Sequence, residues 1–257
     1  MAQRSGCDHL QLPFGYPQRI FARMNAKSAL KGIGVVVAVL LVAFAGFSAY
    51  IWFSGGSAEP SAPAEARRAE PQDEQSVLYE VVAGESVAQF VIGEVLRGQQ
   101  NTVVGSTDQI DGSLALGFSA ATVEIGEFVI NLRNIRTDDE MRDRTIRTMI
   151  LETNRDEFEF STFVPTAVSG VPASFAVGDS LDLQVSGALT VRDVTADVTF
   201  DMLLNIRSEG EIEGTASTVI LWDDFDITIP YVGGDSIVAS VEDEVELRME
   251  FIAAASP

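Results

Sequence analysis

Three arginines, Arg142, Arg144 and Arg147, stand close together in the stretch DDEMRDRTIRTMILET, residues 138–153. A guanidinium group presents its N–H donors in a planar fork that suits carboxylates and phosphates. The same side chains also have acidic neighbours with which to pair, such as Asp139 and Glu140. The pattern therefore allows two roles, contact with the polar head group of a ligand or pairing with local acids.

The rest of the chain limits the chemistry further. Its single cysteine and single histidine, Cys7 and His9, lie near the N-terminus, so residues 77–257 contain neither. This excludes a disulfide framework, a cysteine or histidine zinc site, a cysteine nucleophile and a Ser-His-Asp triad from that part of the chain. The acidic runs DDFD (223–226) and EDE (242–244) lack the spacing of a known calcium loop, and no carboxylate pair indicates hydrolysis. We therefore expect no catalytic residue, no bound metal and no enzymatic activity.

Charge is divided unevenly along the 257 residues. The whole chain has a net charge of −21, and residues 77–257 carry 10 arginines against 32 aspartates and glutamates. A surface this acidic repels nucleic-acid phosphates and anionic lipid headgroups, so we expect neither as its partner. The N-terminal segment 1–31 is basic instead, through Arg4, Arg19, Arg23, Lys27 and Lys31.

A hydrophobic run, Gly32–Phe53, follows this basic segment and contains 22 residues without a charge. As a helix it would be about 33 Å long, which matches the roughly 30 Å hydrocarbon core of a bilayer. A cleavable signal peptide is the alternative, but its apolar region is normally shorter. We predict one transmembrane signal anchor in the cytoplasmic membrane, with residues 1–31 inside the cell and the rest in the periplasm or extracellular space. Met24 is an alternative start that would keep a basic lead-in.

Residues 54–76 are rich in Ala, Pro, Ser and Glu and lack large apolar side chains. Such a composition cannot bury enough surface to fold, so we predict a flexible linker. Residues 77–257 are then long enough to form one domain with a substantial core.

Alternation of apolar and polar residues dominates this domain. In VTFDMLLNIR (198–207) apolar residues recur at every second position, as in a strand with one buried face. Turn signals such as Asp111-Gly112 and Glu209-Gly210 separate about eight or nine such strands. Because long strands with one apolar face must hide these faces together, we predict an all-β fold, an extended antiparallel lipocalin-like β-barrel.

One segment departs from the alternation. Residues 138–151 place Met141, Ile146, Met149 and Ile150 at approximately helical spacing, with charges between them. A helix between two long strands cannot join the sheet. We therefore predict a short inserted helix that lies across one end of the barrel as a lid or plug.

Three stretches resemble the signatures of the YceI-like family of polyisoprenoid-binding proteins. RDRTIRTMILET followed by FEFSTF is similar to the family's helix-plus-strand signature, GALTVRDVTADVTF to its second, and WDDFDI with VEDEVELRMEF to its C-terminal pattern. The signatures come in the family's order between residues 77 and 254. The resemblance implies an extended antiparallel barrel around an apolar channel that binds isoprenoid chains, quinone tails or related amphiphiles, usually in an exported protein.

The chain also departs from the family's pattern. A turn that often reads His-Gly is Arg192-Asp193 here, and the Lys-Pro that commonly follows is Ala196-Asp197. A head-group contact through that His or Lys is therefore absent or replaced. Within FEFSTF, both the Phe158/Phe160 set and the Ser161/Phe163 set are candidates for the inward face.

The preferred hypothesis is a membrane-anchored carrier that holds a polyisoprenoid, quinone or fatty-acyl lipid, with Arg142, Arg144 and Arg147 at its head group. The alternatives are a structural or adaptor domain with a solid core, or an enzyme acting on a bound lipid. No pattern indicates an oligomeric state. Apolar residues at inward positions are the candidates for lining the channel, and they would otherwise fill the core: Phe90, Phe128, Ile130, Leu132, Leu183, Val185, Leu189, Phe200, Met202, Leu204 and Trp222.

Overall fold

The computed structural model describes residues 66–72, 75–230, 232 and 238–256. The predicted basic segment 1–31, the predicted anchor 32–53 and residues 54–65 of the predicted linker lie outside these ranges. Within the described ranges, no helix is long and apolar enough to cross a membrane.

The described chain is built from antiparallel strands, one short α-helix and a few single helical turns. The strands are β1 (Val77–Val81), β2 (Val87–Leu96), β3 (Gln99–Thr107), β4 (Ile110–Gly117), β5 (Thr122–Asn131), β6 (Phe160–Ser169), β7 (Ser180–Val191), β8 (Val194–Ser208), β9 (Glu211–Leu221), β10 (Val238–Val241) and β11 (Glu244–Ala255). The helical elements are η1 (Leu132–Asn134), α2 (Glu140–Thr145), the π-helical turn η2 (Ile146–Ile150), η3 (Asp156–Phe158) and η4 (Trp222–Phe225).

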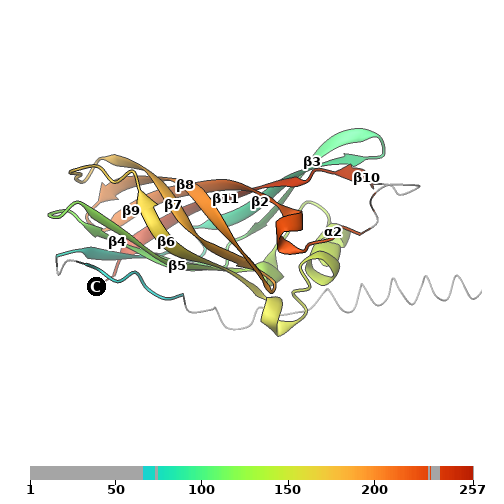
Figure 1. The fold of residues 1–257 in the computed structure, drawn as a ribbon, viewed down its shortest axis with the longest axis horizontal. Helices are drawn as coiled ribbons and strands as arrows, with labels where there is room; N and C mark the ends of the chain where they lie inside the picture. Colours follow the sequence, from blue (N-terminus) through green and yellow to red (C-terminus); the bar gives the residue numbers. More distant parts are fainter. Residues whose placement is uncertain (1–65, 73–74, 231, 233–237, 257) are drawn as a thin grey trace, which may run out of the picture. The chain divides into compact units, whose positions relative to one another are not determined.

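The strands form one sheet that closes on itself (Figure 1). Eight strands follow one another around the barrel in the order β1-β4-β5-β6-β7-β8-β9-β11, and β11 pairs back with β1. The other three strands extend this ring. β2 pairs with β11 next to the part of β11 that pairs with β1, and β3 and β10 both pair with β2. The predicted all-β antiparallel barrel is confirmed.

Two details of the predicted strand pattern are wrong. The sequence QQNTVVGST begins with polar residues rather than an alternating pattern, yet it forms β3 because the tight turn at Arg97-Gly98 pairs it with β2 over its whole length. The predicted turn at Asp111-Gly112 lies inside β4 instead. Gly112 is needed there for space, since a Cβ atom on it would approach the Phe128 ring to 2.6 Å.

The inserted helix is present and lies at one end of the barrel, called here the helix end (Figure 1). The opposite, hairpin end carries the turns between β4 and β5, β6 and β7, and β8 and β9. Ile146 is buried in the main hydrophobic cluster and Ile150 packs against it. Met141, which shares their predicted spacing, is 53% exposed, because α2 turns that side toward solvent.

Residues 66–72, called here the strap, lie over the outer face of β4 and β5, although they belong to the predicted flexible linker. The backbone N–H of Ala69 donates to Ser113 Oγ at 2.8 Å, and the backbone N–H of Glu127 donates to the Arg67 carbonyl at 3.0 Å. Arg68 pairs with Asp111 at 3.0 Å. The strap therefore docks through backbone hydrogen bonds and charge, which its lack of large apolar residues does not reveal.

Gly126 allows this close approach, because a Cβ atom there would lie 2.6 Å from Ala69 N. We expect Gly126→Ala to displace the strap and to speed tryptic cleavage after Arg67 and Arg68 about tenfold, as befits the loss of one or two hydrogen bonds. Gly210→Ala is the matched control, since its Cβ would have only Ser208 Oγ nearby, at 3.8 Å. Equal cleavage rates in the two variants of the full chain would contradict the docking.

Candidate functional site

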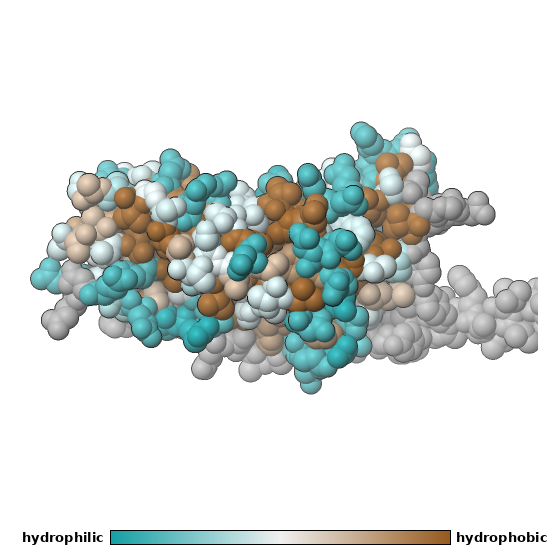
Figure 2. Space-filling view, in the orientation of Figure 1, coloured by the Kyte–Doolittle hydropathy of each residue, from teal (hydrophilic) through white to brown (hydrophobic). Residues whose placement is uncertain are grey.

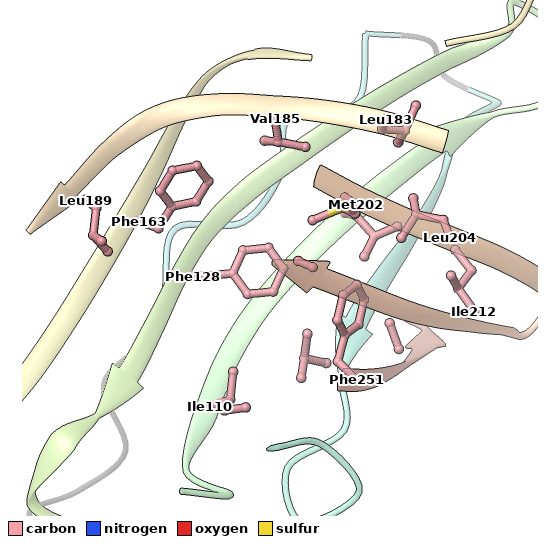
Figure 3. Close-up of a cluster of buried hydrophobic side chains, with 14 of the residues drawn as sticks. Ile110, Phe128, Phe163, Leu183, Val185, Leu189, Met202, Leu204, Ile212 and Phe251 are labelled. Atoms are coloured by element: carbon pink, nitrogen blue, oxygen red, sulfur yellow. The ribbon is translucent and has the colours of Figure 1, made fainter. Parts of the chain in front are cut away.

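The interior of the barrel gathers all eleven predicted apolar residues into one cluster. Figure 3 shows Phe128, Leu183, Val185, Leu189, Met202 and Leu204 among them. Their degrees of burial differ. Seven are buried: Phe128, Leu132, Leu183, Val185, Leu189, Met202 and Leu204. Four are half-buried and pack against the others: Phe90, Ile130, Phe200 and Trp222. Alternation along β8 is as predicted, since Thr199 and Asp201 are exposed on the outer face.

The structure decides between the two candidate inward faces of FEFSTF and adds further interior residues. Phe163 is buried and packs edge-on against Phe200, with ring centroids 5.0 Å apart, so Ser161 and Phe163 form the inward set of β6. Phe158 lies in η3 rather than in the strand. Ile206, on the predicted apolar face of VTFDMLLNIR, also belongs to the cluster. Members that were not predicted are Tyr79, Ile110, Leu114, Leu116, Ile212, Phe225 and Phe251. Their positions in alternating stretches are the signal that could have identified most of them.

Phenylalanine rings cover inward-facing glycines on neighbouring strands. Phe128 lies opposite Gly112, and Phe251 lies opposite Gly214. A Cβ atom on either glycine would collide with the ring. The glycines thus make room for rings that would otherwise crowd the centre of the barrel.

Burial changes along the barrel. On β8, Leu204 and Ile206 are fully buried near the hairpin end, whereas inward residues nearer the helix end keep partial exposure. The same change occurs on β9, whereas on β11 the half-buried Leu247 and Met249 lie between the buried Val245 and Phe251. We call the half-buried inward residues of this region the accessible wall; they are Phe90, Val194, Ala196, Val198, Phe200, Ile220, Trp222 and Leu247.

The accessible wall coincides with an interruption in the sheet. The ladder between β8 and β9 ends at Asp201 and Ser217, so the first half of β8 has no hydrogen-bonded partner on that side among the described residues. The segment after β9 lies beside it, with Phe225 and Ile227 buried in the core. Side-chain packing, rather than a β-ladder, therefore closes this part of the barrel.

The outer surface offers a different kind of hollow. An open groove of about 520 Å³ lies across β7, β8 and β9, and outward residues such as Asp182, Gln184, Asp201 and Thr215 line it. Figure 2 shows hydrophilic and apolar residues mixed over the face in view. Among the described residues, no group of three or more His, Cys, Asp or Glu side chains could hold a metal ion. The apolar candidate site is therefore the interior.

The three predicted head-group arginines differ in their surroundings. Arg142 pairs with Glu94 at 3.2 Å and also with Asp138. Arg144 lies 3.7 Å from the exposed carboxylate of Glu140. Arg147 forms no ion pair with any residue that the structure describes, and its Nε atom is buried without a hydrogen-bond partner.

Burial lowers the pKa of the Arg147 guanidinium. The carboxylate of Asp143 opposes this shift, while the positive charges of Arg136 and Arg144 add to it. An arginine nevertheless stays protonated in a protein. Arg147 therefore keeps its positive charge although burial and two neighbouring arginines disfavour the charged form.

A buried ion pair anchors the inserted segment to the barrel. Arg133 Nη1 lies 2.8 Å from Glu159 Oε2, and both side chains are buried. Asn131 donates to the other oxygen of Glu159 at 2.8 Å, and Arg133 Nε donates to the carbonyl of Thr153 at 2.7 Å. Because the loss of either charge would leave the other buried and unpaired, this network holds both ends of the insertion in place. Arg192 pairs with Glu152 of the same insertion at 3.0 Å.

The closed antiparallel ring and its apolar, partly accessible interior define an antiparallel β-barrel. The chain belongs to the YceI-like family, whose domain matches residues 79–253. No curated protein matches it.

Two solved structures are similar in fold. One is a polyisoprenoid binding domain from Saccharophagus degradans implicated in plant cell wall breakdown, with a TM-score of 0.53, 16% identity, and coverage of 70% of this chain and 99% of the other. The second is BcnA of Burkholderia cenocepacia, with a TM-score of 0.50, 16% identity, and coverage of 67% and 98%.

Phe200 and Phe251 test the gradient of burial. Phe251 is 2% exposed in the packed region, and its replacement by Ala should lower the free energy of unfolding by about 3–5 kcal/mol. Phe200 is half-buried, so Phe200→Ala should cost only about 1–2 kcal/mol. Urea unfolding followed by β circular dichroism measures both. Equal losses would place Phe200 in a solid core.

Proposed function

We propose that the barrel binds and carries an isoprenoid or a similar long-chain lipid, with the apolar tail along the accessible wall. The observation that carries this proposal is the partial exposure of inward apolar side chains on four adjacent strands, β8, β9, β11 and β2. Each CH₂ group that moves from water to such a surface contributes about 0.8 kcal/mol, so a long tail needs few polar contacts.

The interruption between β8 and β9 supports a route of entry. A ladder of backbone hydrogen bonds must break as a unit, whereas no β-ladder among the described residues joins η4 and the residues after it to β8. Local opening is easiest where few backbone hydrogen bonds are lost. The similarity in fold to a polyisoprenoid binding domain is consistent with this proposal.

Lipid loading provides the direct test. The purified full chain should release a long-chain lipid on organic extraction, detected by mass spectrometry. Phe200→Glu should abolish loading, because a carboxylate on the accessible wall costs several kcal/mol to bury against an apolar tail.

Val219→Glu is the matched control, since Val219 is 58% exposed on the outer face of β9, and it should load like the original protein. Thermal melts must first show that both variants are folded. A protein that neither yields lipid nor takes up added lipid would refute the carrier and favour an adaptor domain with a solid core.

We further propose that residues 32–53 anchor the protein in the cytoplasmic membrane, with the barrel on the outer side. The length of the charge-free run and the basic residues before it support this topology. Protease added to intact spheroplasts should then remove the barrel while the N-terminal segment stays protected. Survival of the barrel until the cells are lysed would show the opposite orientation.

A further inference from the structure

A single side chain, that of Arg192, joins three parts of the helix end. Arg192 belongs to the turn between β7 and β8, which lies at this end of the barrel (Figure 1). Its Nη2 atom lies 3.0 Å from Glu152 of the insertion, and its Nη1 atom donates to the carbonyl of Ile150 at 3.4 Å. Nη1 also donates to the carbonyl of Asp226, the residue that follows η4, at 3.5 Å. The side chain is only 16% exposed, so these partners largely enclose it.

The backbone is strained at the residues that meet there. Among the described residues, five that are not glycine have a positive φ. Two of the five lie in the β2–β3 and β4–β5 turns. The other three are Arg192 (φ 58°) and two of its partners, Glu152 (φ 51°) and Asp226 (φ 50°). Such left-handed backbone costs free energy in a residue with a Cβ atom, and strain of this kind clusters in ligand clamps and switch regions.

The turn between β7 and β8 favours a residue other than arginine. Val191 pairs with Val194, so the loop between the two strands has two residues. Where the first residue of such a loop has a positive φ, it is usually glycine or asparagine. In addition, the Nε atom of Arg192 is buried without a hydrogen-bond partner among the described residues, which costs free energy. What arginine adds at this position is therefore the set of contacts made by the end of its side chain.

These contacts bridge the interruption between β8 and β9. The accessible wall begins at Val194, two residues after Arg192, on the part of β8 that has no ladder to β9 among the described residues. The η4 segment, residues 222–227, covers this part and buries Phe225 and Ile227. Arg192 ties the η4 segment to the insertion, which a buried ion pair in turn fixes to the barrel.

We propose that Arg192 is a latch, whose contacts hold the η4 segment over the interruption and whose release sets the rate at which a lipid enters and leaves the barrel. This inference rests on the proposed lipid-binding function. The hydrogen bonds to the two carbonyl oxygens are long and therefore weak, so the ion pair with Glu152 is the main contact that holds the latch closed. Opening breaks these contacts without breaking a β-ladder, and it lets the three strained residues relax.

Hydrogen exchange of the empty protein tests the latch without any lipid. The amide N–H groups of Asp226 and Ile227 donate to carbonyls within η4, so their exchange reports how often the η4 segment opens. In the full chain, Arg192→Gln should speed this exchange about tenfold, since a partly buried ion pair is lost. Exchange at Leu204, in the packed region, should stay unchanged.

A fluorescent fatty acid, dansylaminoundecanoic acid, tests the consequence for binding. It is mixed with the full chain in phosphatidylcholine nanodiscs, and the signal of empty nanodiscs is subtracted. Arg192→Gln should raise the association rate and the dissociation rate about tenfold each and leave Kd unchanged, because an open route speeds passage in both directions. A residue that contacts the lipid directly would change Kd instead.

Arg155→Gln is the matched control. Arg155 pairs with the same Glu152, at 3.2 Å, and with Glu157, and its guanidinium carbon lies 4.1 Å from the centroid of the Phe158 ring. All of these partners belong to the insertion, so this variant loses similar contacts without freeing the η4 segment. Its exchange and its binding rates should match those of the original protein.

Arg192→Gly is a second variant, because glycine adopts a positive φ without strain. It should show the same faster exchange and binding rates, with a melting temperature no lower than that of Arg192→Gln. Unchanged exchange in both Arg192 variants, or an equal increase in Arg155→Gln, would overturn the latch. Faster exchange with unchanged binding rates would also overturn it, since lipid would then take another route. Failure of the fatty acid to bind, with exchange still faster, would overturn the proposed function and leave the hold of Arg192 on η4 standing.

Discussion

The barrel depends on a short antiparallel pairing between Tyr79–Val81 and Ala253–Ala255, which joins its first strand to its last. Without it, both strands would expose an unpaired edge and the inward faces would lose their enclosure. Tyr79 reinforces the closure, because its buried hydroxyl donates to the Glu209 carbonyl at 3.0 Å. Burial, together with the charge of Glu209, raises the pKa of this hydroxyl, so it remains a donor at physiological pH.

Different elements enclose the interior at the two ends of the barrel. Near the hairpin end a dense core fills the interior, although the β5–β6 ladder covers only Phe128–Asn131 and Phe160–Phe163. Near the helix end, the β8–β9 ladder stops, and η4 together with the inserted helix provides the cover. The buried pair of Arg133 and Glu159 keeps that cover attached to the barrel.

Alternation was sufficient to predict the barrel and most of the interior residues, because a strand's two faces are set by sequence alone. Leu132 and Trp222 lie in helical turns instead, η1 and η4. It could not predict that Phe251 covers Gly214, since that contact depends on the register between two strands. Nor could it separate Arg142 from Arg147. The difference arises because Glu94, distant in sequence, folds next to one arginine and not the other. The strap was missed because its contacts are backbone hydrogen bonds that composition does not encode.

Densely packed side chains near the hairpin end close off the inner end of the accessible wall. A ligand that reached deeper would have to displace Leu204, Ile206 and Phe251, which are all at most 2% exposed. From Val194 to Phe200 the wall extends about 20 Å along β8, at roughly 3.4 Å per residue. On the proposed function, the barrel would therefore limit how far an apolar tail can enter, and the packed residues would mark the inner end of the site. A tail longer than this depth would have to leave its excess length outside, whatever its chemistry.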